Sequence, residues 1–232
     1  MEAIYYVNKG KVRENNEDGI LIDDILVIES MQSPKQIEGN FKKIVVSDGM
    51  GGLDNGEVAT KILLETFRDN EIKNQDEIKN TIYKSAGNFL DNSGCATAGI
   101  IFDGFVFNVG DCRVYKKVDM FLNRLTKDHS LAEQLIDIGQ LDEENILEFD
   151  KKNVLTSAVI KNKDIQIYTK EIKIKENDIF LVCSDGLWGE LSLDELEECF
   201  ESEDITEISS NLLKSLELKE VKDNVSFVIV KV

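Results

Sequence analysis

The sequence predicts an α+β fold with mainly antiparallel sheets, for three reasons. Apolar residues recur with a period of about two in some segments and about 3.6 in others, so both strands and helices are expected. The two kinds of segment are grouped along the chain and do not alternate strictly, which disfavours a parallel α/β sheet. A chain of 232 residues can bury one sizeable core, so we expect a single domain over residues 1–232.

The strands are predicted from segments rich in β-branched and aromatic residues. These segments are residues 19–28, 43–47, 98–109, 113–118, 166–174, 179–183 and 225–232. The apolar runs in 43–47 and 179–183 lack an alternation with polar residues, so both strands should be buried on both faces.

The helices are predicted from apolar spacing and from capping boxes. Apolar residues recur about every four positions over residues 57–67 and again over 77–90. Ser130 and Ser192 each precede a Glu by three positions, the pattern in which a hydroxyl and a carboxylate cap the first turn of a helix. A last helix is expected over residues 206–216.

The chain is strongly acidic, with 45 Asp and Glu against 27 Lys and Arg and a formal net charge of −18. This charge repels phosphate backbones, so we expect no nucleic-acid partner. No apolar run approaches the ~20 residues that cross a bilayer, and we expect a cytoplasmic monomer without membrane association. The four cysteines contain no C-x-x-C pair, so neither a zinc ribbon nor a disulfide framework is indicated.

Aspartates end three of the apolar runs. Asp48, Asp111 and Asp185 stand at these strand ends, and further carboxylates lie at 17–18 and at Asp223, just before the last strand. An Asp-Gly pair is also the commonest hairpin turn, and each such pair taken alone allows that interpretation. If the strands instead bring these charges to one end of the sheets, a cation is needed to neutralise them.

The candidate ligands indicate which metal would bind. Carboxylate oxygens suit hard cations, and the single histidine excludes a multi-histidine site, so Mn²⁺ or Mg²⁺ is the natural occupant. Asp48 is followed by Gly49-Met50-Gly51-Gly52, where missing side chains let the backbone approach a ligand closely. The Gly49 carbonyl is therefore a further candidate ligand.

Eight short motifs extend over nearly the whole chain. They are Arg13 with Asn16-Glu17-Asp18, Asp48-Gly49-Met50-Gly51-Gly52 with Gly56-Glu57-Val58-Ala59, Ala96-Thr97-Ala98, Asn108-Val109-Gly110-Asp111-Cys112-Arg113, Leu125-Thr126-Lys127-Asp128-His129-Ser130, Asn153-Val154-Leu155-Thr156, Ser184-Asp185-Gly186-Leu187 and Asp223-Asn224-Val225. In these motifs the chain resembles the metal-dependent protein phosphatase (PPM) family, of the protein phosphatase 2C type, in its bacterial Ser/Thr phosphatase form. The resemblance implies a four-layer αββα sandwich, two antiparallel β-sheets flanked by helices, with metals at one end of the sheets.

The resemblance also implies roles for the matching residues. Asp48 would bridge two core Mn²⁺ or Mg²⁺ ions. Asp185 and Asp223 would complete the first ion's ligands, and the Gly49 carbonyl would bind the second. Arg13 would bind the phosphate of the substrate, since its planar fork matches phosphate oxygens.

Further roles concern the outer part of the site and the reaction. Asp18, with Glu17, would order the metal-bound waters, and Asp111 would hold a weaker third ion. The implied reaction is hydrolysis of phosphoserine or phosphothreonine by direct attack of a metal-bridged hydroxide. The implied partners are phosphorylated proteins and a Ser/Thr kinase that acts on them. The long segment 127–153 would be a variable, flap-like insertion.

Four positions depart from the family pattern. Met50 stands where eukaryotic relatives often have His, and Gly189 where many relatives have a second Asp that helps to hold the third ion. Cys112 replaces a Ser, and Ile160 a Gly. These changes put the third ion in question and leave the two-metal core complete.

Two alternative functions stay open. The signatures of cysteine phosphatases, P-loop enzymes and nucleophile-elbow hydrolases are absent from the sequence. A non-catalytic phosphoprotein-binding regulatory module is disfavoured by the complete set of Asp48, Asp185, Asp223 and Arg13. A phosphatase of a small phosphorylated metabolite is excluded by none of the motifs.

Three residue types near the aspartates have structural interpretations. His129 is expected to fix a turn, and Cys112 and Cys183 to act as small buried side chains. Trp188 is expected either to pack or to contact substrate.

Overall fold

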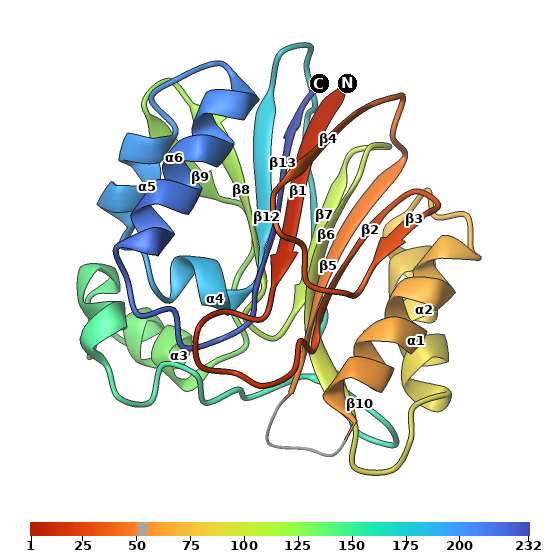
Figure 1. Cartoon of the computed structure of the whole chain (residues 1–232). Coiled ribbons are helices and arrows are strands. Elements are labelled where there is room, and N and C mark those ends of the chain that lie inside the picture. Colours follow the sequence, from red (N-terminus) through yellow and green to blue (C-terminus); the bar gives the residue numbers. More distant parts are fainter. Residues whose placement is uncertain (51–54) are drawn as a thin grey trace.

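The computed structural model describes residues 1–50 and 55–232, which form four layers (Figure 1). Two β-sheets stack face to face. Helices α1 (Gly56–Arg68) and α2 (Gln75–Gly87) cover one sheet, and helices α5 (Leu193–Cys199) and α6 (Ile205–Glu217) cover the other. Both chain ends lie at the same edge. The predicted αββα sandwich is confirmed. Gly51 and Gly52, part of one predicted motif, lie outside the described residues.

Every pairing between strands of the described residues is antiparallel. Sheet A has the order β4-β1-β13-β12-β8-β9, and sheet B the order β11-β7-β6-β5-β2-β3 with β10 beside β6. The strands of sheet A are β4 (Lys35–Glu38), β1 (Glu2–Asn8), β13 (Val225–Lys231), β12 (Ile179–Cys183), β8 (Arg113–Val118) and β9 (Phe121–Arg124). The strands of sheet B are β11 (Tyr168–Glu171), β7 (Phe105–Val109), β6 (Gly94–Ile101), β5 (Lys43–Gly49), β2 (Asp18–Ile22), β3 (Ile25–Val27) and β10 (Val159–Ile160).

The helices are α1 (Gly56–Arg68), α2 (Gln75–Gly87), α3 (Leu131–Asp137), the 3₁₀ helix η1 (Glu143–Glu148), α4 (Asp185–Trp188), α5 (Leu193–Cys199) and α6 (Ile205–Glu217). Two helices, α3 and α5, begin directly after the predicted caps Ser130 and Ser192. Both hydrogen bonds of the predicted capping box form at Ser192. At Ser130 only half of the box forms, because the Glu133 carboxylate pairs with Arg124. No described helix has the length and apolar composition to cross a bilayer.

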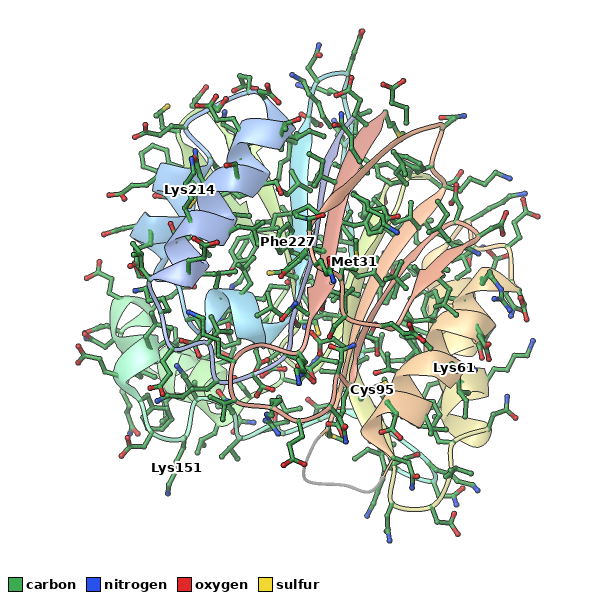
Figure 2. All side chains as sticks on the ribbon, in the orientation of Figure 1. Met31, Lys61, Cys95, Lys151, Lys214 and Phe227 are labelled. Atoms are coloured by element: carbon green, nitrogen blue, oxygen red, sulfur yellow. The ribbon has the colours of Figure 1, made fainter. Side chains whose placement is uncertain are left out.

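The apolar core lies in three sections, one between the sheets and one under each pair of covering helices. Alternate residues of a strand face different sections: Phe227 and Ile229 contact the helix side of sheet A, whereas Val228 and Val230 face sheet B. Figure 2 shows Phe227 between β13 and the helices α5 and α6. The predicted burial of β5 and β12 on both faces is confirmed.

Some predicted strand boundaries are wrong. The single strand predicted over 98–109 is two strands, because the chain turns at Gly104, whose φ of 108° suits glycine. The segment 19–28 is likewise divided by a turn at Asp23, with φ of 48°. The edge strands β4 and β9 escaped prediction because they are short and largely polar. Strand β1 escaped because its apolar run 3–7 is too short to show a period.

Candidate active site

Five aspartates gather at the end of the sandwich where α4 lies. In sheet B, Asp48 at the end of β5 pairs in register with Asp18 at the start of β2. On the sheet A side, Asp185 follows β12 as the first residue of α4, and Asp223 precedes β13. Asp111 follows β7. Neither Asp48-Gly49 nor Asp185-Gly186 forms a hairpin turn, since Asp48 and Gly49 lie within β5 and Asp185 begins a helix.

The carboxyl groups repel one another and are partly or fully buried. Asp18 and Asp111 are buried, and Asp48 and Asp185 are surrounded by protein atoms although partly accessible. Burial, and then the charge of neighbouring carboxylates, raises the pKa of Asp48 and of Asp111 well above its usual range. Burial likewise raises the pKa of Asp18 to about 7 and that of Asp185 to about 6. A bound cation would stabilise the ionised form of these clustered carboxylates.

Two glycines allow the backbone segments of the site to touch. A Cβ on Gly186 would lie 1.9 Å from the Asn224 carbonyl oxygen, so only glycine lets Asp185 and Asp223 come together. A Cβ on Gly49 would lie 2.5 Å from the Gly56 carbonyl group. The Gly49 N–H donates to the Glu17 carbonyl at 3.1 Å, which places Glu17 beside the predicted ligand Gly49.

Arg13 stands at the edge of the carboxylate group. Its Nη2 donates to Asp223 Oδ2 at 2.7 Å, and its side chain is 44% exposed. The hydrogen bond from Arg13 to Asp223 raises the pKa of the guanidinium, and the charges of Glu17 and Asp185 add to the effect. Arg13 therefore presents a permanent positive charge to solvent beside the site.

Asn224 holds the loop that carries Arg13. Its Nδ2 donates to the carbonyl oxygens of Lys9 at 3.0 Å and Asn15 at 2.9 Å, and its Oδ1 accepts from the Glu17 N–H at 2.8 Å. The side chain thus satisfies three backbone groups on both sides of Arg13 and lies next to Asp223 in sequence. A single amide fixes the arginine loop relative to the carboxylates.

The carboxylates have the chemistry that hard divalent cations require. Asp18 Oδ1 and Asp185 Oδ1 are buried, and neither has a hydrogen-bond partner among the described residues. No group of three or more His, Cys, Asp or Glu side chains in 1–50 and 55–232 already has the arrangement to hold an ion, so an ion would have to draw the carboxylates closer. Carboxylate oxygens without a hydrogen-bond partner are suitable ligands for Mn²⁺ or Mg²⁺.

The base of the 127–153 insertion is tied to Asp111 through Trp188. Asp128 pairs with the buried Arg113 guanidinium, with Nη2 to Oδ2 at 2.7 Å. The guanidinium carbon lies 3.4 Å from the centre of a Trp188 ring, and Trp188 Nε1 donates to the Asp111 carbonyl at 2.9 Å. Trp188 is buried and packs between Asp111 and Arg113. Lys152, at the other end of the insertion, donates to the Gly189 carbonyl at 2.9 Å.

A cavity of about 1010 Å³ lies beside this network, between the insertion and the helices α4 and α5. Arg113, Trp188 and Arg124 line it, whereas none of the five clustered aspartates does. It is therefore separate from the carboxylate site, with Trp188 between the two.

The neighbouring cysteines and the histidine have the structural roles expected of them. Burial raises the pKa of the Cys112 thiol well above its usual range, and it also raises the pKa of Cys183, so both stay protonated. His129 Nδ1 accepts from the Gly110 N–H at 3.2 Å, and the His129 N–H donates to the Gly110 carbonyl at 2.8 Å. His129 thereby fixes the turn before Asp111.

Sequence comparison shows which known proteins this chain is similar to. No protein-family model matches the sequence. The chain is 28% identical over 224 residues to the serine/threonine phosphatase stp of Listeria monocytogenes, an alignment that covers 87% of this chain and 84% of that protein. It is 24% identical over 242 residues to the serine/threonine protein phosphatase PstP of Mycobacterium tuberculosis, which covers 97% of this chain and 44% of that protein.

Solved structures share the fold. The PPM Ser-Thr phosphatase MsPP of Mycobacterium smegmatis, in complex with cacodylate, superposes with a TM-score of 0.80 at 22% identity, covering 98% of this chain and 96% of that one. The catalytic domain of PstP, with two manganese ions, superposes with a TM-score of 0.75 at 21% identity and covers 99% of this chain and 98% of that one. The chain therefore has the fold of these PPM phosphatases and is similar in sequence to named bacterial Ser/Thr phosphatases.

The structure brings together the residues that the sequence motifs single out. The set consists of Arg13, Glu17, Asp18, Asp48, Gly49, Asp111, Asp185 and Asp223. The sequence motifs contain Asn224 and Ser184 without indicating their roles, and they omit Ser226. Asn224 holds the arginine loop, and Ser184 and Ser226 bind Asp18. Each stands within three positions of a proposed ligand, and that proximity is the signal that marks them.

Proposed function

We propose that this chain hydrolyses phosphoserine and phosphothreonine in proteins and uses Mn²⁺ or Mg²⁺ as its cofactor. The observation that carries the proposal is the convergence of buried aspartates from both sheets on one point, with an exposed arginine at its edge. The two named bacterial Ser/Thr phosphatases among the relatives, and the manganese ions in the PstP structure, support it.

The proposed ligands divide between the two sheets. Asp48 on sheet B would bridge two ions, Asp185 and Asp223 beside sheet A would complete the first, and the Gly49 carbonyl would bind the second. Bound cations of this kind supply a Lewis acid and a water acidic enough to attack phosphate at neutral pH. Asp111 would hold a weaker third ion, with Gly189 supplying no second carboxylate for it.

Residues around the ions would bind and orient the substrate. The Arg13 guanidinium makes one side-chain hydrogen bond in the described part of the chain, to Asp223. Its remaining N–H groups are available to grip two phosphate oxygens of the substrate, as its planar fork allows. Asp18, with Glu17, would orient bound waters. In a chain of net charge −18, Arg13 and the cations together must attract a phosphate dianion.

The partners and location form part of the same proposal. The substrates would be targets of a Ser/Thr protein kinase, and the chain would act as a monomer in bacterial signalling. A cytoplasmic location suits the four cysteines, which are all free and buried, because a reducing compartment keeps thiols unpaired.

Phosphate release by purified protein tests the proposal. The substrates would be p-nitrophenyl phosphate, a phosphothreonine peptide and a panel of phosphorylated metabolites, each assayed with Mn²⁺, with Mg²⁺ and with excess chelator. We expect metal-dependent release, fastest from the peptide among the biological substrates. If one metabolite is hydrolysed faster than the peptide, the proposed substrate changes from a phosphoprotein to that metabolite. Folded protein that binds the phosphopeptide but releases nothing with either metal would indicate a binding module.

A further inference from the structure

Asp18 is joined to the opposite sheet by two hydroxyl groups. It lies on β2 of sheet B, yet its Oδ2 accepts from Ser184 Oγ at 2.7 Å and from Ser226 Oγ at 2.7 Å, and both serines belong to the sheet A side. Asp18 is 1% exposed and both serines are 0% exposed. This hydrogen-bonded contact joins the two sheets, whose facing sides also form the apolar core section between them.

The available protons determine the direction of each bond. A serine hydroxyl has one proton, and the short distances to an anionic acceptor assign both protons to Asp18 Oδ2. Ser184 Oγ also accepts from the Ser226 N–H at 3.0 Å, which fixes the rotation of the Ser184 hydroxyl. The other oxygen, Asp18 Oδ1, is buried and has no partner among the described residues. The carboxylate is thus held by one oxygen and leaves the second free.

The hydrogen bonds of Asp18 with the two serines lie beside the proposed ligands of both sheets. Asp18 pairs in register with Asp48 on sheet B. On the other side, Ser184 immediately precedes Asp185, and Ser226 follows Asp223 by three positions. An ion shared between Asp48 and Asp185 requires a fixed spacing of the two sheets at this end.

We infer that Ser184 and Ser226 are positioning residues of the metal site, which hold Asp18 across the sheets, set the spacing of the two ligand halves and leave Asp18 Oδ1 facing the ions. The inference rests on the proposed function, because it needs a metal bound by Asp48, Asp185 and Asp223. Removal of partners that orient metal ligands typically lowers metal affinity by about 10–100-fold.

Calorimetric titration of Mn²⁺ into the metal-free protein tests the inference without any assay of activity. Ser226→Ala is the main variant because, among the described residues, the Ser226 hydroxyl makes hydrogen bonds only with Asp18 and Ser184. The matched control is Ser85→Ala, which removes a hydroxyl of equal burial that donates to Thr81 in α2, on the outer side of sheet B. We expect Ser226→Ala to weaken Mn²⁺ binding by about 10–100-fold, Ser226→Thr to restore most of it, and Ser85→Ala to leave it unchanged.

The outcomes separate the inference from the proposed function. Wild-type Mn²⁺ affinity in Ser226→Ala, with only the melting temperature of the metal-free protein lowered, would make the serine purely structural and overturn the inference. Absence of Mn²⁺ binding by the wild-type protein would instead contradict the proposed function. If Ser226→Ala does not fold, Ser184→Ala takes its place in the same titration, with the same expected loss of affinity.

Discussion

Asp48 is the residue that links the two halves of the proposed site, since it lies on sheet B and feels the charge of Asp185 and Asp223 across the sandwich. Replacing its carboxylate with an amide leaves the shape and removes the charge. We predict that Asp48→Asn lowers phosphate release from a phosphothreonine peptide at least about 1,000-fold, because loss of metal catalysis costs several kcal/mol of transition-state stabilisation. Circular dichroism would check that the variant is folded. An Asp48→Asn protein of normal activity contradicts the site.

Arg13 acts on the substrate and not on the metals in the proposed reaction. We predict that Arg13→Ala lowers kcat/KM by about 10–100-fold, since a hydrogen bond to a charged group contributes about 1.5–3 kcal/mol, while Mn²⁺ affinity stays near the wild-type value. Arg13→Lys retains the charge without the fork and should recover part of the loss. The role in phosphate binding would be refuted by unchanged kcat/KM in Arg13→Ala.

At the scale of elements, the loop between β1 and β2 depends on one side chain from just before β13. Asn224→Ala removes three hydrogen bonds, each of which contributes about 0.5–1.5 kcal/mol, so we predict a loss of roughly 2–4 kcal/mol in the free energy of unfolding. Urea denaturation measures this loss. Asn123→Ala, at an exposed position of β9, is the control and should be neutral.

The same loop predicts a coupling between two residues. Because Asn224 acts on catalysis by placing Arg13, the losses in kcat/KM of Asn224→Ala and Arg13→Ala should not add in the double variant. Fully additive losses would show that Asn224 affects the reaction by another route.

The sequence predicts this site as far as its signals are local. The aspartates at the ends of β5, β7 and β12 stand out because apolar strands precede them within a few residues. Ser226 and Asn224 stand within three positions of Asp223, but the sequence does not show what they contact, because their partners are distant: Ser226 contacts Asp18 at a separation of 208 residues. The turn inside 98–109 does carry a local signal, the pair Asp103-Gly104, but the apolar residues on both sides of it resemble one continuous strand.

At the scale of the whole molecule, the buried carboxylates make stability depend on pH. Folding raises the pKa of Asp18 to about 7 and that of Asp185 to about 6, from an ordinary value of 3.8. Between about pH 4 and pH 7 the folded metal-free state therefore binds protons that the unfolded chain has released, so stability falls as pH rises. We predict a lower melting temperature at pH 8 than at pH 5, a shallower decline in Asp18→Asn, and recovery at pH 8 when Mn²⁺ is added. Equal slopes for both proteins would contradict the buried-charge explanation.

The most direct test of the site is a crystal structure of the Mn²⁺-soaked protein, with the ions located by their anomalous scattering. We predict two manganese ions at the end of the sandwich near α4, one in contact with Asp48, Asp185 and Asp223 and the other with Asp48 and the Gly49 carbonyl. If the soaked crystals contain manganese but none of it lies at these aspartates, the central claim that they form the metal centre is contradicted.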